Sequence, residues 1–258
     1  MRHSWEIDEN VSEPQNPDII TSLSSRAENL YKQGKYSEAE RLYKKLLKIT
    51  IKVFGKKHLN TGIVLNNVAE SLNGQRRYSE AEPLFKRAAE IFKKVAGPQH
   101  PDTALSIANL ALNLDDQGRH SEAEPLLKRV VEILEKTPGP EHPYTALSLN
   151  NVAVNLEKQN RYSEAEALLK RVVEIFTKIV GPQHQDTALS LTNLALNLEK
   201  QNRYSEAEPL FKMTLEIFEK KLEPEHPYTA VALYNLVDNL KEQGKHSEAK
   251  EIQKKYQK

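Results

Sequence analysis

The sequence has no cysteine, two methionines and one tryptophan, and aromatic residues make up only 7% of its 258 positions. The lack of cysteine excludes disulfides, thiolate metal sites and cysteine nucleophiles. No run approaches the roughly 20 apolar residues of a membrane-spanning helix. Residues 1–18 carry acids at Glu6, Asp8, Glu9 and Glu13 and lack the apolar segment of a secretory signal. We therefore expect a cytoplasmic protein without a membrane role.

An excess of charge of either sign is also missing, because 37 Lys and Arg balance 36 Asp and Glu. Basic pairs such as Lys44-Lys45 have acidic neighbours and no systematic aromatic interleaving, which argues against nucleic-acid binding. The chain has no glycine-rich phosphate loop. Ser, His and acids recur as copies along the chain, whereas an active site needs one unique constellation. We expect no enzyme activity and no cofactor.

What the sequence does contain is a repeat of 42 residues, the spacing from Tyr36 to Tyr78. Three independent markers keep this period, so chance does not explain it. Tyr/His-Ser-Glu-Ala begins at Tyr36, Tyr78, His120, Tyr162, Tyr204 and His246; a histidine recurs at His58, His100, His142, His184 and His226; an asparagine recurs at Asn67, Asn109, Asn151, Asn193 and Asn235. Six units result.

Each unit has the pattern of two helices joined by a tight turn. In the third unit apolar residues recur at helical spacing over 103–117 and again over 122–136. Gly118 lies between them and supplies the positive φ that ends a helix. Asn160 and Asn202 replace this glycine in the next two units, and asparagine tolerates the same conformation. Ser121 with Glu124 predicts a capping box at the start of the second helix, repeated in the other units except the last.

These features predict an all-α fold, a right-handed superhelix of about six helical hairpins in which each unit contacts mainly its neighbours. We expect residues 1–18 to form a disordered leader and residues 19–258 to form the repeat domain. The predicted units are centred on turns at 34–36, 76–78, 118–120, 160–162, 202–204 and 244–246.

The apolar and small positions of each hairpin resemble the tetratricopeptide repeat. In the third unit they are Ile107, Leu110, Ala111, Leu114, Ala123, Leu127 and Val130. The usual period of that family is about 34 residues, and the period of 42 with Gly-Pro-x-His-Pro-x-Thr-Ala resembles its kinesin light chain type. Only about 20 residues without heptads precede the first repeat, so a motor subunit is not expected.

The resemblance implies a protein-interaction scaffold, or adaptor, that holds a peptide segment of an unidentified partner in the concave groove lined by the first helix of each hairpin. A carboxamide both donates and accepts hydrogen bonds, so a ladder of asparagines can bind a peptide backbone. Apolar neighbours would select hydrophobic anchors. The predicted groove residues are Asn67, Asn109, Asn113, Asn151, Asn155, Asn193, Asn197, Asn235, Asn239, Leu112, Val154 and Leu196.

Two alternatives stay open for these residues and for the function. Each asparagine could instead bridge to the adjacent hairpin and set the twist of the stack. The chain could also be a structural protein that self-associates through its hairpin ends without a peptide ligand; the scaffold hypothesis predicts a monomer or weak self-association.

Two more specific sites are not expected. The carboxylate clamp of chaperone-binding members needs a lysine where this chain has Ser24, Asn66, Ala108, Asn150, Thr192 and Tyr234. The histidine series resembles a metal ladder, but equivalent side chains of stacked hairpins lie on the order of 10 Å apart, too far to share one ion. We expect these histidines to brace the loops.

Overall fold

The computed structural model describes residues 17–222 and 226–255 of the chain. Every regular element in these residues is an α-helix, which confirms the predicted all-α fold of helical hairpins. Residues 1–16 of the expected leader, Trp5 included, lie outside the described residues.

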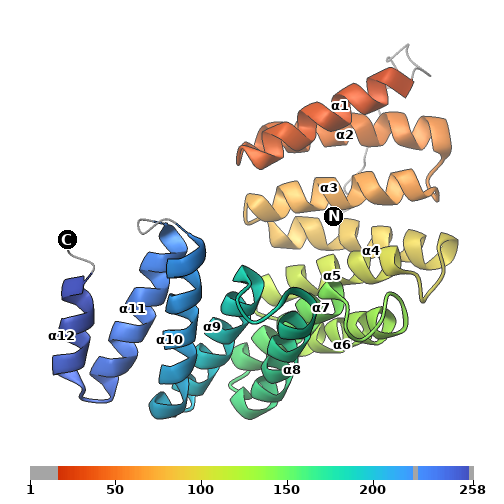
Figure 1. The fold of residues 1–258 in the computed structure, drawn as a ribbon. Coiled ribbons are helices and arrows are strands. Elements are labelled where there is room, and N and C mark those ends of the chain that lie inside the picture. The colour runs from red at the N-terminus through yellow and green to blue at the C-terminus, as the bar shows by residue number, and fades with distance from the viewer. Residues whose placement is uncertain (1–16, 223–225, 256–258) are drawn as a thin grey trace. The chain divides into compact units, whose positions relative to one another are not determined.

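The helices alternate between a first helix, which we call the A helix of its hairpin, and a second, the B helix (Figure 1). The A helices are α1 (Pro17–Lys32), α3 (Leu59–Gly74), α5 (Pro101–Asp116), α7 (Pro143–Lys158), α9 (Gln185–Lys200) and α11 (Pro227–Glu242). The B helices are α2 (Tyr36–Phe54), α4 (Tyr78–Val95), α6 (His120–Lys136), α8 (Tyr162–Val180), α10 (Tyr204–Lys221) and α12 (His246–Lys255).

The chain divides into two compact units, residues 1–98 with α1 to α4 and residues 99–258 with α5 to α12. Within each unit a helix contacts mainly the helix before it and the helix after it in the sequence. This pattern is that of a stack in which neighbouring hairpins share their apolar faces.

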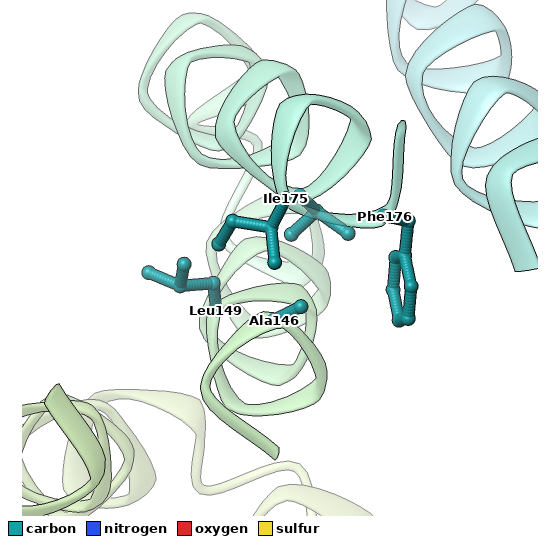
Figure 2. Packing of buried hydrophobic residues seen from close by; sticks show 5 residues of the cluster. Ala146, Leu149, Ile175 and Phe176 are labelled. Atoms are coloured by element: carbon teal, nitrogen blue, oxygen red, sulfur yellow. The ribbon is translucent and has the colours of Figure 1, made fainter. Parts of the chain in front are cut away.

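The core of a hairpin forms where the apolar faces of its two helices meet. Figure 2 shows Ile175 of α8 beside Ala146 and Leu149 of α7, and all three side chains are buried. Val131 of the preceding hairpin packs against the same cluster. The small Ala146 lets the helices approach closely, so one continuous core joins successive hairpins.

The turn between the A and B helices depends on one residue in the left-handed region. Gly118 has φ of 75°, and Asn160 and Asn202 each have φ of 59°, as predicted. Arg76 takes the same conformation in the second hairpin, although the sequence gives no sign of it. In each case the next backbone N–H reaches back toward the end of the A helix, as from Arg119 N to Leu114 O at 3.0 Å.

The predicted capping box at the start of the B helices is wrong. These helices begin one residue before the serine, and the N-cap residues are Lys35, Arg77, Arg119, Arg161 and Arg203, none of which caps through its side chain. The tight turn leaves a single residue between the left-handed position and the helix, which moves the serine inside the first turn. The N-cap arginine instead binds the glutamate three residues later, as Arg161 binds Glu164 at 2.7 Å.

The recurring histidine caps the A helix. Nδ1 of His184 accepts a hydrogen bond from the backbone N–H of Asp186 at 3.2 Å. His58, His100, His142 and His226 do the same for the residue two positions later. The side chain therefore satisfies one of the N–H groups that a helix start leaves without a partner.

The threonine of the same motif closes the loop between hairpins. Thr187 is 1% exposed and donates its hydroxyl to the carbonyl of Gly181 at 2.8 Å. Gly181 has φ of 94°, which only glycine adopts readily. Thr61 and Thr145 bond to Gly55 and Gly139 in the same way. In these three loops the threonine and the glycine thus hold the chain between one hairpin and the next.

We predict that His184→Ala lowers the free energy of unfolding by about 1 kcal/mol, the usual effect of removing an N-cap. His184→Asn should keep the stability near wild type, because asparagine is a strong N-cap. Urea unfolding followed by circular dichroism measures both. Equal losses in the two variants would show that the ring does not act as a cap.

Candidate functional site

The second unit exposes one stripe of each A helix, and we call these stripes together the A face. On α5 the stripe comprises Leu105, Asn109 and Leu112, whose spacing of four and three residues places them on one side of a helix. Leu105 is 51% exposed and Leu112 is 38% exposed. The equivalent stripes are Leu147, Asn151 and Val154 on α7, Leu189, Asn193 and Leu196 on α9, and Val231, Asn235 and Asp238 on α11.

The A face is apolar in its middle and polar at its last helix. Val154 and Leu196 are 37% and 36% exposed, so the three predicted apolar groove residues all lie at the surface. On α11 the exposed Asp238 takes the place of this aliphatic residue. Successive A helices therefore present similar aliphatic side chains in the same register.

The outer row of predicted asparagines, Asn109, Asn151, Asn193 and Asn235, lies half-buried on the A face. Asn193 also donates its carboxamide to Asn150 of the preceding hairpin at 2.9 Å. Asn67 is half-buried on α3 of the first unit, near the exposed Ile63. These side chains still reach the surface.

The inner row, by contrast, does not line a groove. Asn113, Asn155, Asn197 and Asn239 are fully buried, with 0% exposure. The carboxamide of Asn155 donates to Asp115 Oδ1 at 2.7 Å and to the carbonyl of His120 at 3.0 Å. We therefore correct the prediction for these four residues, which are buried and line no groove. Asn155, Asn197 and Asn239 bridge to the preceding hairpin, which is the structural alternative that the sequence left open.

The acceptors of the inner row are buried or half-buried acids that the sequence analysis did not single out. Asn197 donates to Glu157 at 2.6 Å, and Asn239 donates to Glu199 at 2.7 Å. Asp115, Glu157 and Glu199 recur at the same 42-residue spacing, which is the signal that could have identified them. An acid and an amide that keep one register in successive repeats indicate a bond between those repeats.

Asp115 collects several of these contacts at one carboxylate. It accepts from Lys158 Nζ at 2.5 Å and lies 2.6 Å from His120 Nδ1, and it is only 5% exposed. Burial raises the pKa of Asp115, but bonds from Lys158, His120 and Asn155 outweigh it and hold that pKa below its usual value. The carboxylate is therefore structural.

A second set of contacts joins the B helix of one hairpin to the turn of the next. Glu166 accepts from Gln201 Nε2 at 3.0 Å and from Arg203 Nη1 at 2.6 Å. Glu40, Glu124 and Glu208 make equivalent contacts with the following glutamine, and Glu40 and Glu124 also with the following arginine. The predicted capping glutamate thus links hairpins instead of closing its own helix.

These contacts fix the ionisation of the linking glutamates. Lys128, then Gln159 and Arg161, lower the pKa of Glu124 to about 2 despite partial burial. Burial raises the pKa of Glu166, yet Lys170, Gln201 and Arg203 lower it to about 2. Burial likewise raises the pKa of Glu208, yet Lys212, Lys245 and Gln243 lower it to about 2. The glutamates therefore stay charged where an ordinary carboxyl group would begin to protonate.

Other classes of site find no support in the described residues. Within residues 17–222 and 226–255 no three His, Cys, Asp or Glu side chains gather as metal ligands would. In the same part of the chain no helix has the length and apolar character needed to cross a membrane.

Comparisons with known proteins agree with this architecture. A family model for the tetratricopeptide repeat matches residues 18–94, 62–136, 116–178, 164–220 and 186–257. No curated protein matches the chain.

Solved structures of similar fold include "Podosopora anserina putative kinesin light chain nearly identical TPR-like repeats". That structure is 25% identical, has a TM-score of 0.72, and covers 81% of this chain and 100% of its own. BtubC from P. vanneervenii is 17% identical, with a TM-score of 0.69 over 95% of this chain and 91% of its own. A Rap protein complexed with competence and sporulation factor is 14% identical, with a TM-score of 0.65 over 95% and 76%. The last two show likeness of fold alone.

We predict that Asn155→Ala lowers the free energy of unfolding by about 1–3 kcal/mol, because it leaves buried acceptors without their donor. Asn151→Ala, at the half-buried outer row, should cost no more than about 0.5 kcal/mol. Urea denaturation of the two variants compares the rows directly. A larger loss at Asn151 than at Asn155 would contradict the assignment.

We also predict an acid-sensitive stability. The linking glutamates Glu124, Glu166 and Glu208 have pKa values of about 2 in the folded protein against an ordinary 4.5. Their contribution is full above pH 4.5 and disappears as pH falls toward about 2. Thermal unfolding across this range should show a falling midpoint. A variant with Glu124→Gln, Glu166→Gln and Glu208→Gln should be less stable at neutral pH and have a flatter profile; a slope as steep as wild type would assign the acid sensitivity to other groups.

Proposed function

We propose that this chain, which belongs to the tetratricopeptide repeat family, is a scaffold. In this proposal it binds a segment of a partner protein on the A face. The observation that carries the proposal is the exposure of aliphatic side chains in one register on successive A helices, each beside a half-buried asparagine. Larger exposed apolar patches rimmed by polar groups mark interaction sites.

The spacing of the helices indicates the form of the segment. Packed helices lie about 8–10 Å apart, and an extended chain advances about 3.3 Å per residue. A segment that crosses α5, α7 and α9 would therefore meet the next helix about every third residue. Apolar residues at that spacing could contact Leu112, Val154 and Leu196, and the segment's backbone could bond to Asn109, Asn151 and Asn193.

Because the inner asparagines are buried, the proposed binding site contains fewer polar side chains than the sequence predicts. The contacts that hold the hairpins together use Asn155, Asn197 and Asn239, and Lys158 and Lys200 bond to Asp115 and Glu157. The groups that remain on the A face are mostly aliphatic side chains and the outer asparagines. This composition supports apolar anchoring with backbone bonding more than recognition of a charged partner.

The repetition of similar side chains on α5, α7 and α9 supports binding over catalysis, because it distributes equivalent contacts along a surface. One of the similar folds, the Rap protein, was solved complexed with competence and sporulation factor. The location that fits a scaffold of this kind is the cytoplasm. Self-association without a peptide ligand is the alternative that the following experiment separates.

The test is a selection of binding peptides from a displayed library, followed by fluorescence anisotropy with the selected peptides. A variant with Leu112→Ser, Val154→Ser and Leu196→Ser should bind them at least about tenfold more weakly, since each lost aliphatic contact removes on the order of 1 kcal/mol. A matched control replaces Ile179, Val180 and Met213, which are equally exposed on B helices of the same unit.

The control should bind as wild type does. Equal weakening in both variants would move the binding surface away from the A face. Failure to select any peptide, together with particles that grow with protein concentration in sedimentation, would favour the self-associating alternative.

A further inference from the structure

Within each unit, most contacts between hairpins run in one direction, because an amide or a cation of one hairpin donates to an acid of the hairpin before it. Ser37, Ser163 and Lys212 are exceptions, since they donate to the hairpin that follows. Asn197, Gln201 and Arg203 of the fifth hairpin are donors. Their acceptors in the fourth hairpin are Glu157 on the A helix and Glu166 on the B helix. We call these two sides the donor face and the acceptor face of a hairpin.

The first hairpin carries a donor face at the N-terminal end of the stack. Four of its residues are equivalent to donor-face residues three repeats later. They are Ser22 for Ser148, Asn29 for Asn155, Gln33 for Gln159 and Lys35 for Arg161. Ser148 and Asn155 are buried against the preceding hairpin, at 5% and 0% exposure. Their counterparts on α1 are exposed.

One substitution makes this end more basic than the internal donor faces. Arg26 stands where Val152 is 2% exposed, and Arg26 itself is exposed. Lys32 is bound to Glu28 at 2.6 Å, so these two charges offset each other. Arg26 and Lys35 remain as the cations of the face. This face thus combines amide donors with the two cations Arg26 and Lys35.

The last hairpin has lost the acceptor face. Lys241 occupies the register of Glu157 and Glu199, and Lys250 occupies the register of Glu166 and Glu208. Both acceptors have become cations, which cannot accept the hydrogen bonds of an asparagine, a glutamine or an arginine.

The shape of this end has changed as well. Tyr234 and Val237 stand in the registers of Asn150 and Ala153, and Tyr234 is 67% exposed. Gln253 takes the register of the buried Leu169. Together with Lys241 these side chains line a shallow pocket at the end of the stack. Larger and polar groups thus occupy the place that a further A helix would need.

We propose that the donor face of the first hairpin is a second interaction surface, distinct from the A face, and that it binds a helical hairpin of another protein that presents two carboxylates in the arrangement of Glu157 and Glu166. The same chemistry joins the hairpins inside the chain, so the geometry of the complex is already established there. A second copy of this chain does not fit as the partner. By the internal registers, Lys241 would face Asn29 and Lys32, and Lys250 would face Gln33 and Lys35.

The probe is a variant of this chain whose acceptor face is restored. It carries Tyr234→Asn, Val237→Ala, Lys241→Glu and Lys250→Glu, together with Arg26→Glu and Lys35→Glu so that it does not bind itself. Circular dichroism first establishes that the probe is folded. A milder probe keeps the buried Val237 but carries the other substitutions, and it serves if the first one is unfolded.

Sedimentation velocity of wild type mixed with the probe should show a one-to-one complex that weakens with added salt. Arg26→Glu with Lys35→Glu in the wild-type component should weaken the complex at least about tenfold. A control probe that retains Lys241 and Lys250 but carries the other substitutions should not bind.

Three results would overturn the proposal. They are the absence of a complex with folded probes, a complex that the reversal at Arg26 and Lys35 leaves unchanged, and concentration-dependent association of the wild-type chain alone. The first two results do not bear on peptide binding at the A face, which is measured separately, whereas the third would also favour the self-associating alternative.

Discussion

The stacking of the second unit depends on one buried interaction, the bond from an asparagine carboxamide to an acid of the preceding hairpin. Asn155, Asn197 and Asn239 have no exposed surface, so each must find partners within the protein. The donors go to Asp115, Glu157 and Glu199, and the carboxamide oxygen accepts from the glutamine four residues later. Because a shifted register would leave these groups buried without partners, the interaction fixes how successive hairpins stack.

The remaining sequence motifs place these partners at the correct distance. The left-handed residue of each turn and the arginine after it bring the next B helix into position, and the linking glutamate then joins that B helix to the following turn. In the loops between hairpins, the histidine cap and the threonine bond to the glycine carbonyl hold the start of the next A helix. The 42-residue period is thus the length of a hairpin together with a loop of fixed geometry.

The two rows of asparagines have different roles, and this difference has a functional consequence. Asn155, Asn197 and Asn239 of the inner row hold the second unit together, whereas the outer row and its aliphatic neighbours lie at the surface. A groove built in this way can change its ligand by changing Leu112, Val154 or Leu196 without loss of stacking. The proposed docking on the first hairpin would use the same kinds of contact that stack the hairpins, from amides and cations to carboxylates, to bind another protein.

The fold could be predicted from the sequence because its evidence is local and repeated. The helical spacing of apolar residues predicts each helix from its own sequence. The turns are predicted in the same way, by Gly118, Asn160 and Asn202. The role of an asparagine could not be read in this way, since Asn109 and Asn113 are the same residue one turn apart. What separates the rows is an acceptor about 40 positions earlier in the chain, as Asp115 is for Asn155. The capping box failed for a related reason, because Ser121 and Glu124 fit the local pattern while Glu124 binds groups of the next hairpin.

A double-mutant cycle between Asn197 and Glu157 tests the central claim most directly. Urea unfolding of Asn197→Ala, Glu157→Ala and the double variant gives the coupling energy of the pair, and sites that share a buried bond typically couple by about 0.5–3 kcal/mol. The account predicts a coupling energy in this range, with the double variant less destabilised than the sum of the single variants. Additive losses would contradict it, because they would show that the buried amide and the acid of the preceding hairpin act independently.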